Sequence, residues 1–176
     1  MDTADWERRL AAAWASIDEL DEPEFLALIA SLAAEVDAGS EADAGAGAGV
    51  FERASSLDST GHSDLAVPLY RKALEAGLTG ERRRRAVIQL ASSLRNLGQP
   101  ATSVELLTAE LTAGSDQLDD AVRAVLARAL VDVGREREAV SLAVGALAGH
   151  LPRYQRSMAN YARLLLEPES ESAPKR

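Results

Sequence analysis

Apolar residues recur at intervals of three and four along nearly the whole chain, and short polar turns separate one stretch from the next. This spacing places them on one face of successive helices, and no run of alternating Val, Ile or Thr indicates a strand. The first two stretches predict an acidic αα-hairpin over residues 1–37. Its apolar positions are Trp6, Leu10, Ala13, Trp14, Ile17, Phe25, Leu28, Ile29, Leu32 and Val36.

The segment that follows, residues 38–49, reads Ala-Gly-Ser-Glu-Ala-Asp-Ala-Gly-Ala-Gly-Ala-Gly. Alternating glycine makes a helix costly in backbone entropy, so we expect a flexible linker here. A glycine-rich phosphate loop would need a strand before it, and the pattern predicts a helix there instead. The linker is therefore the favoured interpretation.

Beyond the linker, a spacing of small residues recurs with a period in the thirties. Its glycines, Gly61, Gly98 and Gly134, lie 37 and 36 residues apart, and each separates two apolar helical stretches. Such a period indicates stacked helix-turn-helix units, none of which can bury its apolar face alone. We therefore expect residues 50–166 to form three helix pairs and a terminal capping helix, followed by a disordered tail over 167–176. The expected helices cover about 50–60, 64–76, 81–97, 100–113, 117–133, 136–149 and 152–166.

Composition agrees with an all-α chain and limits the chemistry that it can carry. Aromatic residues make up 4% of the chain and cysteine is absent, which excludes disulfides, thiolate metal sites and cysteine nucleophiles. No apolar run approaches the roughly 20 residues of a membrane span, and the acidic N-terminus does not resemble a signal peptide. These features predict a cytoplasmic protein.

Charge is distributed unevenly between the two parts of the chain. Residues 1–49 hold 12 acids and 2 bases, a net charge of −10, whereas residues 50–176 hold 17 bases and 16 acids, a net charge of +1. Four of these bases are consecutive, Arg82–Arg85, but successive helical residues point in different directions and cannot all face one phosphate backbone. Nucleic-acid binding is thus a distant alternative. We expect the arginines to receive the acidic hairpin, which either caps the stack or competes for its groove; its aromatic residues need burial, which favours the cap.

The repeated segment resembles the tetratricopeptide repeat (TPR) family, in register over about residues 47–166. The family pattern places small residues where paired helices touch. The matching residues are Ala54, Ala91 and Ala127 in the first helices and Ala66, Ser103 and Ala139 in the second. The repeats are degenerate, because they lack the Trp and the paired Tyr of the pattern and run two or three residues longer. Residues 82–98 are similar to a small bacterial branch of the family, and high Ala, Arg and Gly usage is typical of an actinobacterium.

This resemblance implies a short right-handed helical-repeat solenoid whose first helices line a concave groove for a peptide or protein segment. On the helix at 81–97, polar residues share the side opposite the apolar face. Amides and hydroxyls there could pair with a peptide backbone, and arginines with carboxylates. The predicted groove residues are Arg85, Gln89, Ser92, Arg95, Asn96 and Arg128, with Ser55, Ser59 and Asp132 as a continuation. The alternative is an ordinary solvated face, although such faces are usually richer in Glu and Lys.

No catalytic, metal-binding or cofactor-binding pattern accompanies this groove. His62 and His150 lie at helix ends, without a partner that spacing assigns, and are expected to cap helices. Some family members clamp the C-terminal carboxylate of chaperone tails, and that clamp is missing here: the matching positions hold Phe51, Ser55, Gln89, Ala121 and Val125. The leading hypothesis is therefore a non-catalytic protein–protein interaction scaffold with an unknown protein or peptide partner. The alternative is a homo-oligomerising module whose exposed apolar seams form a homodimer.

Overall fold

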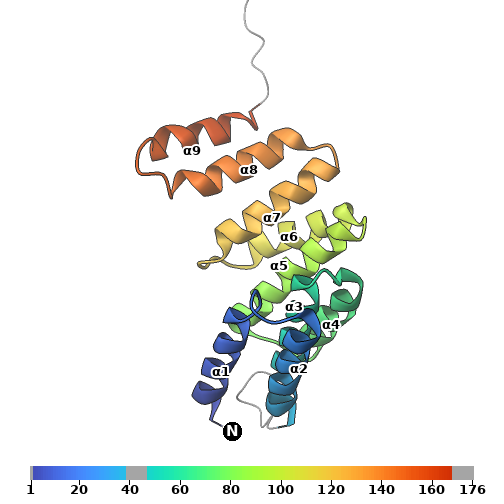
Figure 1. Cartoon of the computed structure of the whole chain (residues 1–176). Helices are drawn as coiled ribbons and strands as arrows, with labels where there is room; N and C mark the ends of the chain where they lie inside the picture. Colours follow the sequence, from blue (N-terminus) through green and yellow to red (C-terminus); the bar gives the residue numbers. More distant parts are fainter. Residues whose placement is uncertain (1, 39–46, 168–176) are drawn as a thin grey trace, which may run out of the picture.

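The computed structural model describes residues 2–38 and 47–167, and within these ranges all regular structure is helical. The helices stack in sequence order, from α1 and α2 at one end of the molecule to α9 at the other (Figure 1). Each helix packs against the next, and α5 also contacts α3 and α7. This arrangement confirms the predicted all-α helical-repeat solenoid. The helices are α1 Thr3–Ala15, α2 Glu22–Ala38, α3 Ala48–Ser59, α4 Ser63–Glu75, α5 Gly80–Asn96, α6 Pro100–Ala113, α7 Asp119–Asp132, α8 Glu136–Ala148 and α9 Gln155–Leu164.

The period of the sequence arises from the way in which each helix pair turns. Gly61, Gly98 and Gly134 have φ angles of 92°, 77° and 73°, in the left-handed region that glycine enters without a Cβ penalty. In each turn the glycine amide donates to the carbonyl three residues earlier, and the next amide donates to the carbonyl five residues earlier. These two bonds form a Schellman motif, which ends a helix. The glycines therefore mark where the first helix of each pair stops.

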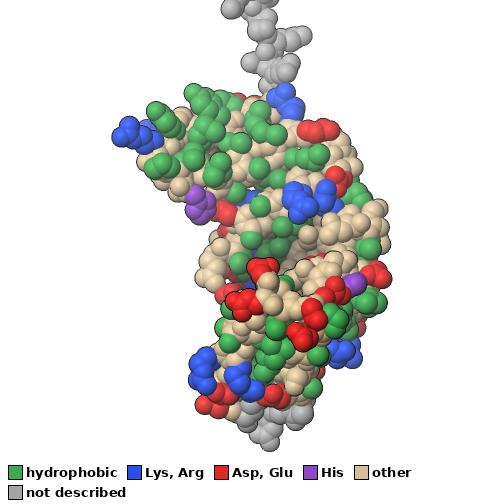
Figure 2. Space-filling model, in the orientation of Figure 1, with side chains coloured by type: hydrophobic (Ala, Val, Ile, Leu, Met, Phe, Trp, Pro, Cys, Tyr) green, Lys and Arg blue, Asp and Glu red, His purple; other side chains and the backbone are tan. Residues whose placement is uncertain are grey.

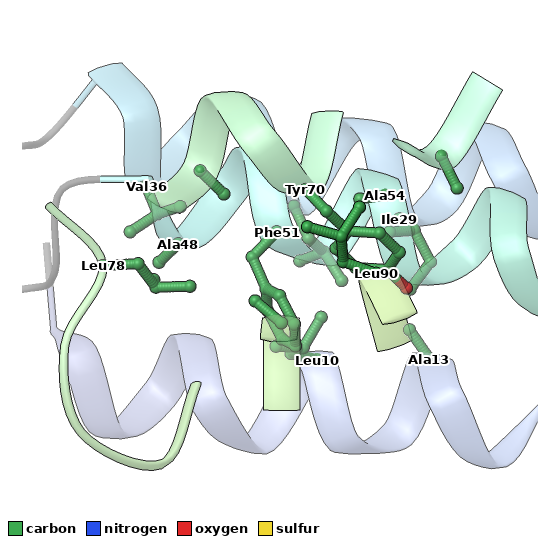
Figure 3. Packing of buried hydrophobic residues seen from close by; sticks show 14 of the residues in the cluster. Leu10, Ala13, Ile29, Val36, Ala48, Phe51, Ala54, Tyr70, Leu78 and Leu90 are labelled. Atoms are coloured by element: carbon green, nitrogen blue, oxygen red, sulfur yellow. The ribbon is translucent and has the colours of Figure 1, made fainter. Parts of the chain in front are cut away.

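The small residues predicted at the helix seams are all buried, with exposed fractions of 6% or less. Larger side chains fill two core clusters that meet at α5. The first cluster joins α1 to α5, and Figure 3 shows Leu10 of α1 next to Phe51 of α3 within it. The second cluster joins α5 to α8 around Leu107 and Leu126. Small residues at the seams allow the helices to approach closely enough for these clusters to form.

The N-terminal hairpin belongs to the first of these clusters. Trp6 and Phe25 are each only 1% exposed, and Nε1 of Trp6 donates a hydrogen bond of 2.8 Å to a backbone carbonyl of α2. Trp14 meets the edge of Phe25 at a ring-centroid distance of 5.4 Å. Its Nε1 also donates to Oε2 of Glu52 on α3 at 2.9 Å. The aromatic residues of the hairpin thus find their burial at the N-terminal end of the stack.

The structure corrects both ends of the predicted linker. Ala38 is the last residue of α2, and Ala48 and Gly49 lie buried in the first turn of α3. A Cβ atom on Gly49 would lie 2.4 Å from the carbonyl oxygen of Ala33, so this glycine permits a close helix contact. Composition alone does not distinguish such a glycine from a flexible one. The rest of that segment, residues 39–46, lies outside the described residues, as do residues 168–176 of the predicted tail.

The terminal helix begins later than predicted. α9 starts at Gln155 and not at Pro152, because Tyr154 takes a left-handed conformation with φ 69° and ψ 12° that cannot belong to a right-handed helix. α9 packs on α8 through Ala162, whose carbonyl accepts a 2.7 Å hydrogen bond from Oγ of Ser141. Its inner face is therefore small and close-packed.

Candidate protein-binding surface

α5 is buried over most of its circumference, which leaves only a narrow polar strip for a ligand. Its predicted apolar face is at most 7% exposed at Val87, Leu90, Ala91 and Leu94. Ile88 and Ser93 are also buried, since α7 and α3 flank the helix on either side. Gly80–Asn96 therefore acts as the central helix of the solenoid, with neighbours on three sides.

Three of the six predicted groove residues are engaged within the molecule. The guanidinium of Arg85 lies 5.2 Å from the ring centroid of Phe51, and Oε1 of Gln89 accepts a 3.2 Å hydrogen bond from Ser55. Arg95 forms an ion pair with Asp132 of α7, with its Nε 2.6 Å from Oδ2 and its Nη2 3.2 Å from Oδ1. These contacts join α5 to α3 and α7, so half of the predicted set serves the fold.

The other three predicted residues, Ser92, Asn96 and Arg128, keep their polar atoms available. Ser92 is half-buried, and Asn96 and Arg128 are exposed. Within residues 2–38 and 47–167, their side chains have no hydrogen-bond or ion-pair partner. A hydroxyl, an amide and a guanidinium are therefore free to meet a ligand.

α7 adds apolar positions that the sequence interpretation missed. Ala121, Ala124 and Val131 are exposed and share one helix face with Arg128, because they lie at steps of three and four residues. The Arg95–Asp132 ion pair brings this face next to the polar strip of α5. Counting helical steps from Arg128 would have found these residues in the sequence. We call the combined set the α5–α7 surface: Ser92, Asn96, Ala121, Ala124, Arg128 and Val131.

The predicted continuation onto α3 is corrected by the structure. Ser55 and Phe51 are both fully buried, so neither can contact a ligand. The hairpin contributes to this burial, since Leu10 lies next to Phe51 (Figure 3). Ser59 is exposed at the end of α3, but Asp132 is already paired with Arg95. The α5–α7 surface therefore stops at the seam between α3 and α5.

The four arginines of the row do not share one direction, as helical geometry predicts. Only Arg82 reaches the acidic hairpin: its Nη2 donates to Glu7 at 2.7 Å, and its guanidinium lies 5.2 Å from the ring centroid of Trp6. The Nε of Arg82 also donates to Glu52 of α3 at 3.2 Å. One arginine therefore links α1, α3 and α5.

The next two arginines bind the other side of the solenoid. Arg83 donates to Glu110 of α6 at 2.7 Å. Arg84 is only 5% exposed; its Nη1 lies 2.6 Å from Asp116 and its Nη2 lies 2.7 Å from Asp119. With Arg85 stacked on Phe51, the row presents no common cationic face to a phosphate backbone.

A buried polar cluster that the sequence did not predict joins α3, α4 and α5. Asp58 accepts hydrogen bonds from Ser93 at 2.7 Å, Ser63 at 3.1 Å and the Tyr70 hydroxyl at 3.4 Å. Burial raises the pKa of Tyr70, which keeps its hydroxyl protonated and able to donate. This cluster satisfies hydrogen-bonding groups where the three helices meet.

The two histidines form side-chain pairs and cap no helix through their side chains. Nε2 of His62 lies 2.6 Å from Glu22, and Nε2 of His150 lies 3.0 Å from Asp120. In the part of the chain that the structure describes, no group of His, Asp and Glu side chains could hold a metal ion. No helix among these residues has the length and apolar character to cross a bilayer.

Stacked helix pairs with repeated Schellman turns and a surface along their first helices define a helical-repeat protein. A family model described as tetratrico peptide repeat matches residues 47–165. The chain therefore belongs to the tetratricopeptide repeat family. No curated protein matches the chain significantly in sequence. Neither the family model nor the similar solved structures indicate the predicted bacterial branch of the family.

Solved structures show the same fold over a longer part of the chain. The chain is similar to a Podosopora anserina protein assigned as a kinesin light chain with nearly identical TPR-like repeats. The TM-score is 0.67 at 20% identity, and the match covers 94% of each chain. A crystal structure of a point variant of that protein gives the same TM-score and identity, with 94% of this chain and 93% of that chain covered. Because 94% of this chain extends well beyond residues 47–165, the matched fold includes the N-terminal hairpin.

Proposed function

We propose that this protein is a non-catalytic scaffold that binds a segment of another protein on the α5–α7 surface. Membership of a family of protein interaction scaffolds supports the general role. The observation that supports the location is that Ser92, Asn96 and Arg128 have no partners within the described ranges. Their polar neighbours on α5, Gln89 and Arg95, are by contrast paired with Ser55 and Asp132.

The chemistry of this surface favours an extended segment with an acidic residue. Ser92 and Asn96 can each donate and accept hydrogen bonds, as the backbone of an extended peptide requires. Arg128 can bind a carboxylate with two parallel hydrogen bonds. Ala121 and Ala124 are small, so a peptide can approach the backbone of α7 closely. The carboxylate of Asp132, which follows Val131 in α7, is already neutralised by Arg95 and would not repel an acidic segment.

The location can be tested with a photo-crosslinking amino acid at position 124, in cells or extracts of the source organism. We expect it to capture a specific protein segment, whereas the same amino acid at Leu65, exposed on α4, should not. Arg128→Glu should weaken that partner's binding at least tenfold, about the effect of losing one charge-assisted hydrogen bond. Arg71→Glu, a charge reversal at an exposed residue of α4, is the matched control.

Circular dichroism would first show that both charge variants remain helical. Equal capture from positions 124 and 65 would contradict the proposed surface. So would a partner that binds Arg128→Glu as tightly as it binds the wild type.

A further inference from the structure

Exposed apolar side chains gather over α8 and α9, at the opposite end of the molecule from the hairpin (Figure 2). Tyr154 is 75% exposed and Tyr161 is 58% exposed, and Leu164 and Leu166 are also exposed. In α9 only Ala162 is buried, where the helix packs on α8. The terminal helix thus covers the stack with its small face, leaves Met158 and Leu165 half-buried, and exposes the two tyrosines and the other two leucines.

Two of these side chains, Tyr154 and Tyr161, belong to an apolar stripe at α9. Met158, Tyr161 and Leu165 follow one another at steps of three and four residues, which keeps them on one face, and Tyr154, directly before the helix, lies beside Met158 and Tyr161. A hollow of about 560 Å³ lies along this stripe, lined by Leu151, Pro152, Arg153, Tyr154, Ser157, Met158 and Tyr161. A neighbouring helix could place its own side chains in such a hollow.

The backbone at the start of the stripe is strained. Tyr154 is the single non-glycine residue of the described chain with a positive φ, a conformation that is unfavourable for a side chain with a Cβ. Because the ring of Tyr154 is 75% exposed, burial within the chain does not offset this unfavourable conformation. As the N-cap of α9, Tyr154 accepts hydrogen bonds at its carbonyl from the Met158 amide at 2.9 Å and from Oγ of Ser157 at 3.0 Å, and its ring lies exposed at the start of the stripe.

We propose that α9 pairs in antiparallel orientation with α9 of a second copy of this protein. Met158 and Tyr161 lie three residues apart on one face of α9. Two copies that run antiparallel can therefore place Met158 of each copy against Tyr161 of the other, with the Tyr154 end of each copy beside the Leu165 end of the other. The interface is isologous, so it closes on two chains and does not extend into a fibre.

The charges at the two ends of the stripe fit this orientation. Arg153 lies just before the stripe and has no ion-pair partner among residues 2–38 and 47–167. Glu167 lies just after the stripe, where it accepts from Arg163. An antiparallel pair brings the end of each copy that carries Arg153 to the end of the other copy that carries Glu167, so both ends gain an attraction. A parallel pair would place the like charges together.

Sedimentation velocity over about 1 to 200 µM, a range that covers weak and moderate dimers, would test the pairing. We expect the wild type to double in mass within this range. Tyr161→Glu should raise the dimer Kd at least tenfold, because two charges per dimer would then enter an apolar contact. Leu65→Glu, at a residue 52% exposed on α4, is the matched control and should dimerise like the wild type.

Charge reversal tests the antiparallel register directly. Arg153→Glu and Glu167→Arg should each weaken the dimer, because each brings like charges together, and the double variant should restore it. The proposal is overturned if the wild type stays monomeric, if Tyr161→Glu dimerises normally, or if the double variant is no better than the single ones. These residues lie outside the α5–α7 surface. The test of dimerisation can therefore fail while the test of partner binding succeeds, and the reverse.

Discussion

Gly49 and Gly149 should respond in opposite ways to the same substitution. Gly49 faces α2, where a Cβ atom would lie 2.4 Å from a backbone oxygen, whereas nothing lies within 4 Å of a Cβ on Gly149. We expect Gly49→Ala to lower the free energy of unfolding by about 1–3 kcal/mol, since overpacking outweighs the gain in helix propensity. Gly149 has helical dihedral angles, so Gly149→Ala should leave the free energy of unfolding unchanged or raise it by up to about 1 kcal/mol.

Urea denaturation of the two variants and the wild type measures this difference. If Gly49→Ala were as stable as Gly149→Ala, α2 and α3 could not be in the close contact that the structure shows. The comparison therefore separates a glycine that allows close packing from one that only ends a helix.

At the scale of single residues, the sequence predicted which side chains share a face and missed what covers them. Gln89, Ser92 and Asn96 do lie on one side of α5, but Ser55 opposite Gln89 is fully buried. The residues that cover Phe51 include Leu10, which is distant in sequence and belongs to α1. Helical periodicity describes one helix at a time, so it does not reveal contacts between distant helices.

At the scale of elements, the helix ends marked by glycine were predicted best. A glycine at the end of a helix is a local sequence signal for a Schellman motif. The predicted helix at 81–97, which such a glycine follows, is found at Gly80–Asn96. The start of α9 was missed, because a left-handed tyrosine carries no sequence signal. The ends of the predicted linker were missed because glycine serves both flexibility and close packing.

The ion pair between Arg84 of α5 and Asp119 of α7 predicts that the folded protein loses stability at acid pH. Hydrogen bonds from Oγ of Ser115 and the amide of Asp116, together with Arg84, lower the pKa of Asp119 to about 2. The folded protein thus resists protonating this carboxylate more than the unfolded chain does. Its stabilising effect is complete above the ordinary aspartate pKa of about 4, and is lost as the pH falls towards 2.

We therefore expect Asp119→Asn to be less stable than the wild type at pH 6, and the two proteins to become equal as the pH approaches 2. Thermal unfolding at several pH values between about 2 and 6 measures this convergence. Asp64→Asn, at an exposed residue in the first turn of α4, is the control and should differ little from the wild type at pH 6. A constant difference between wild type and Asp119→Asn at every pH would contradict the assigned role of this carboxylate.

At the scale of the whole molecule, contacts connect neighbours along the stack and leave its two ends apart. The hairpin and α3 share the first core cluster, whereas α7 and α8 share the second, and α5 contributes to both. In a solenoid of this kind, stability is close to a sum of local terms and nearest-neighbour interfaces. The hairpin at one end and α9 at the other are therefore connected only through the helices between them.

This organisation predicts that damage to one cluster stays local. Ile29 in the first cluster is fully buried and Leu126 in the second is 3% exposed, so each change to Ala should cost about 2–5 kcal/mol. In hydrogen exchange, Ile29→Ala should accelerate exchange in α1 to α3 and spare α7 and α8, and Leu126→Ala should do the reverse. If both variants accelerated exchange equally in every helix, the stack would open as one cooperative unit, and α5 would transmit the loss from one cluster to the other.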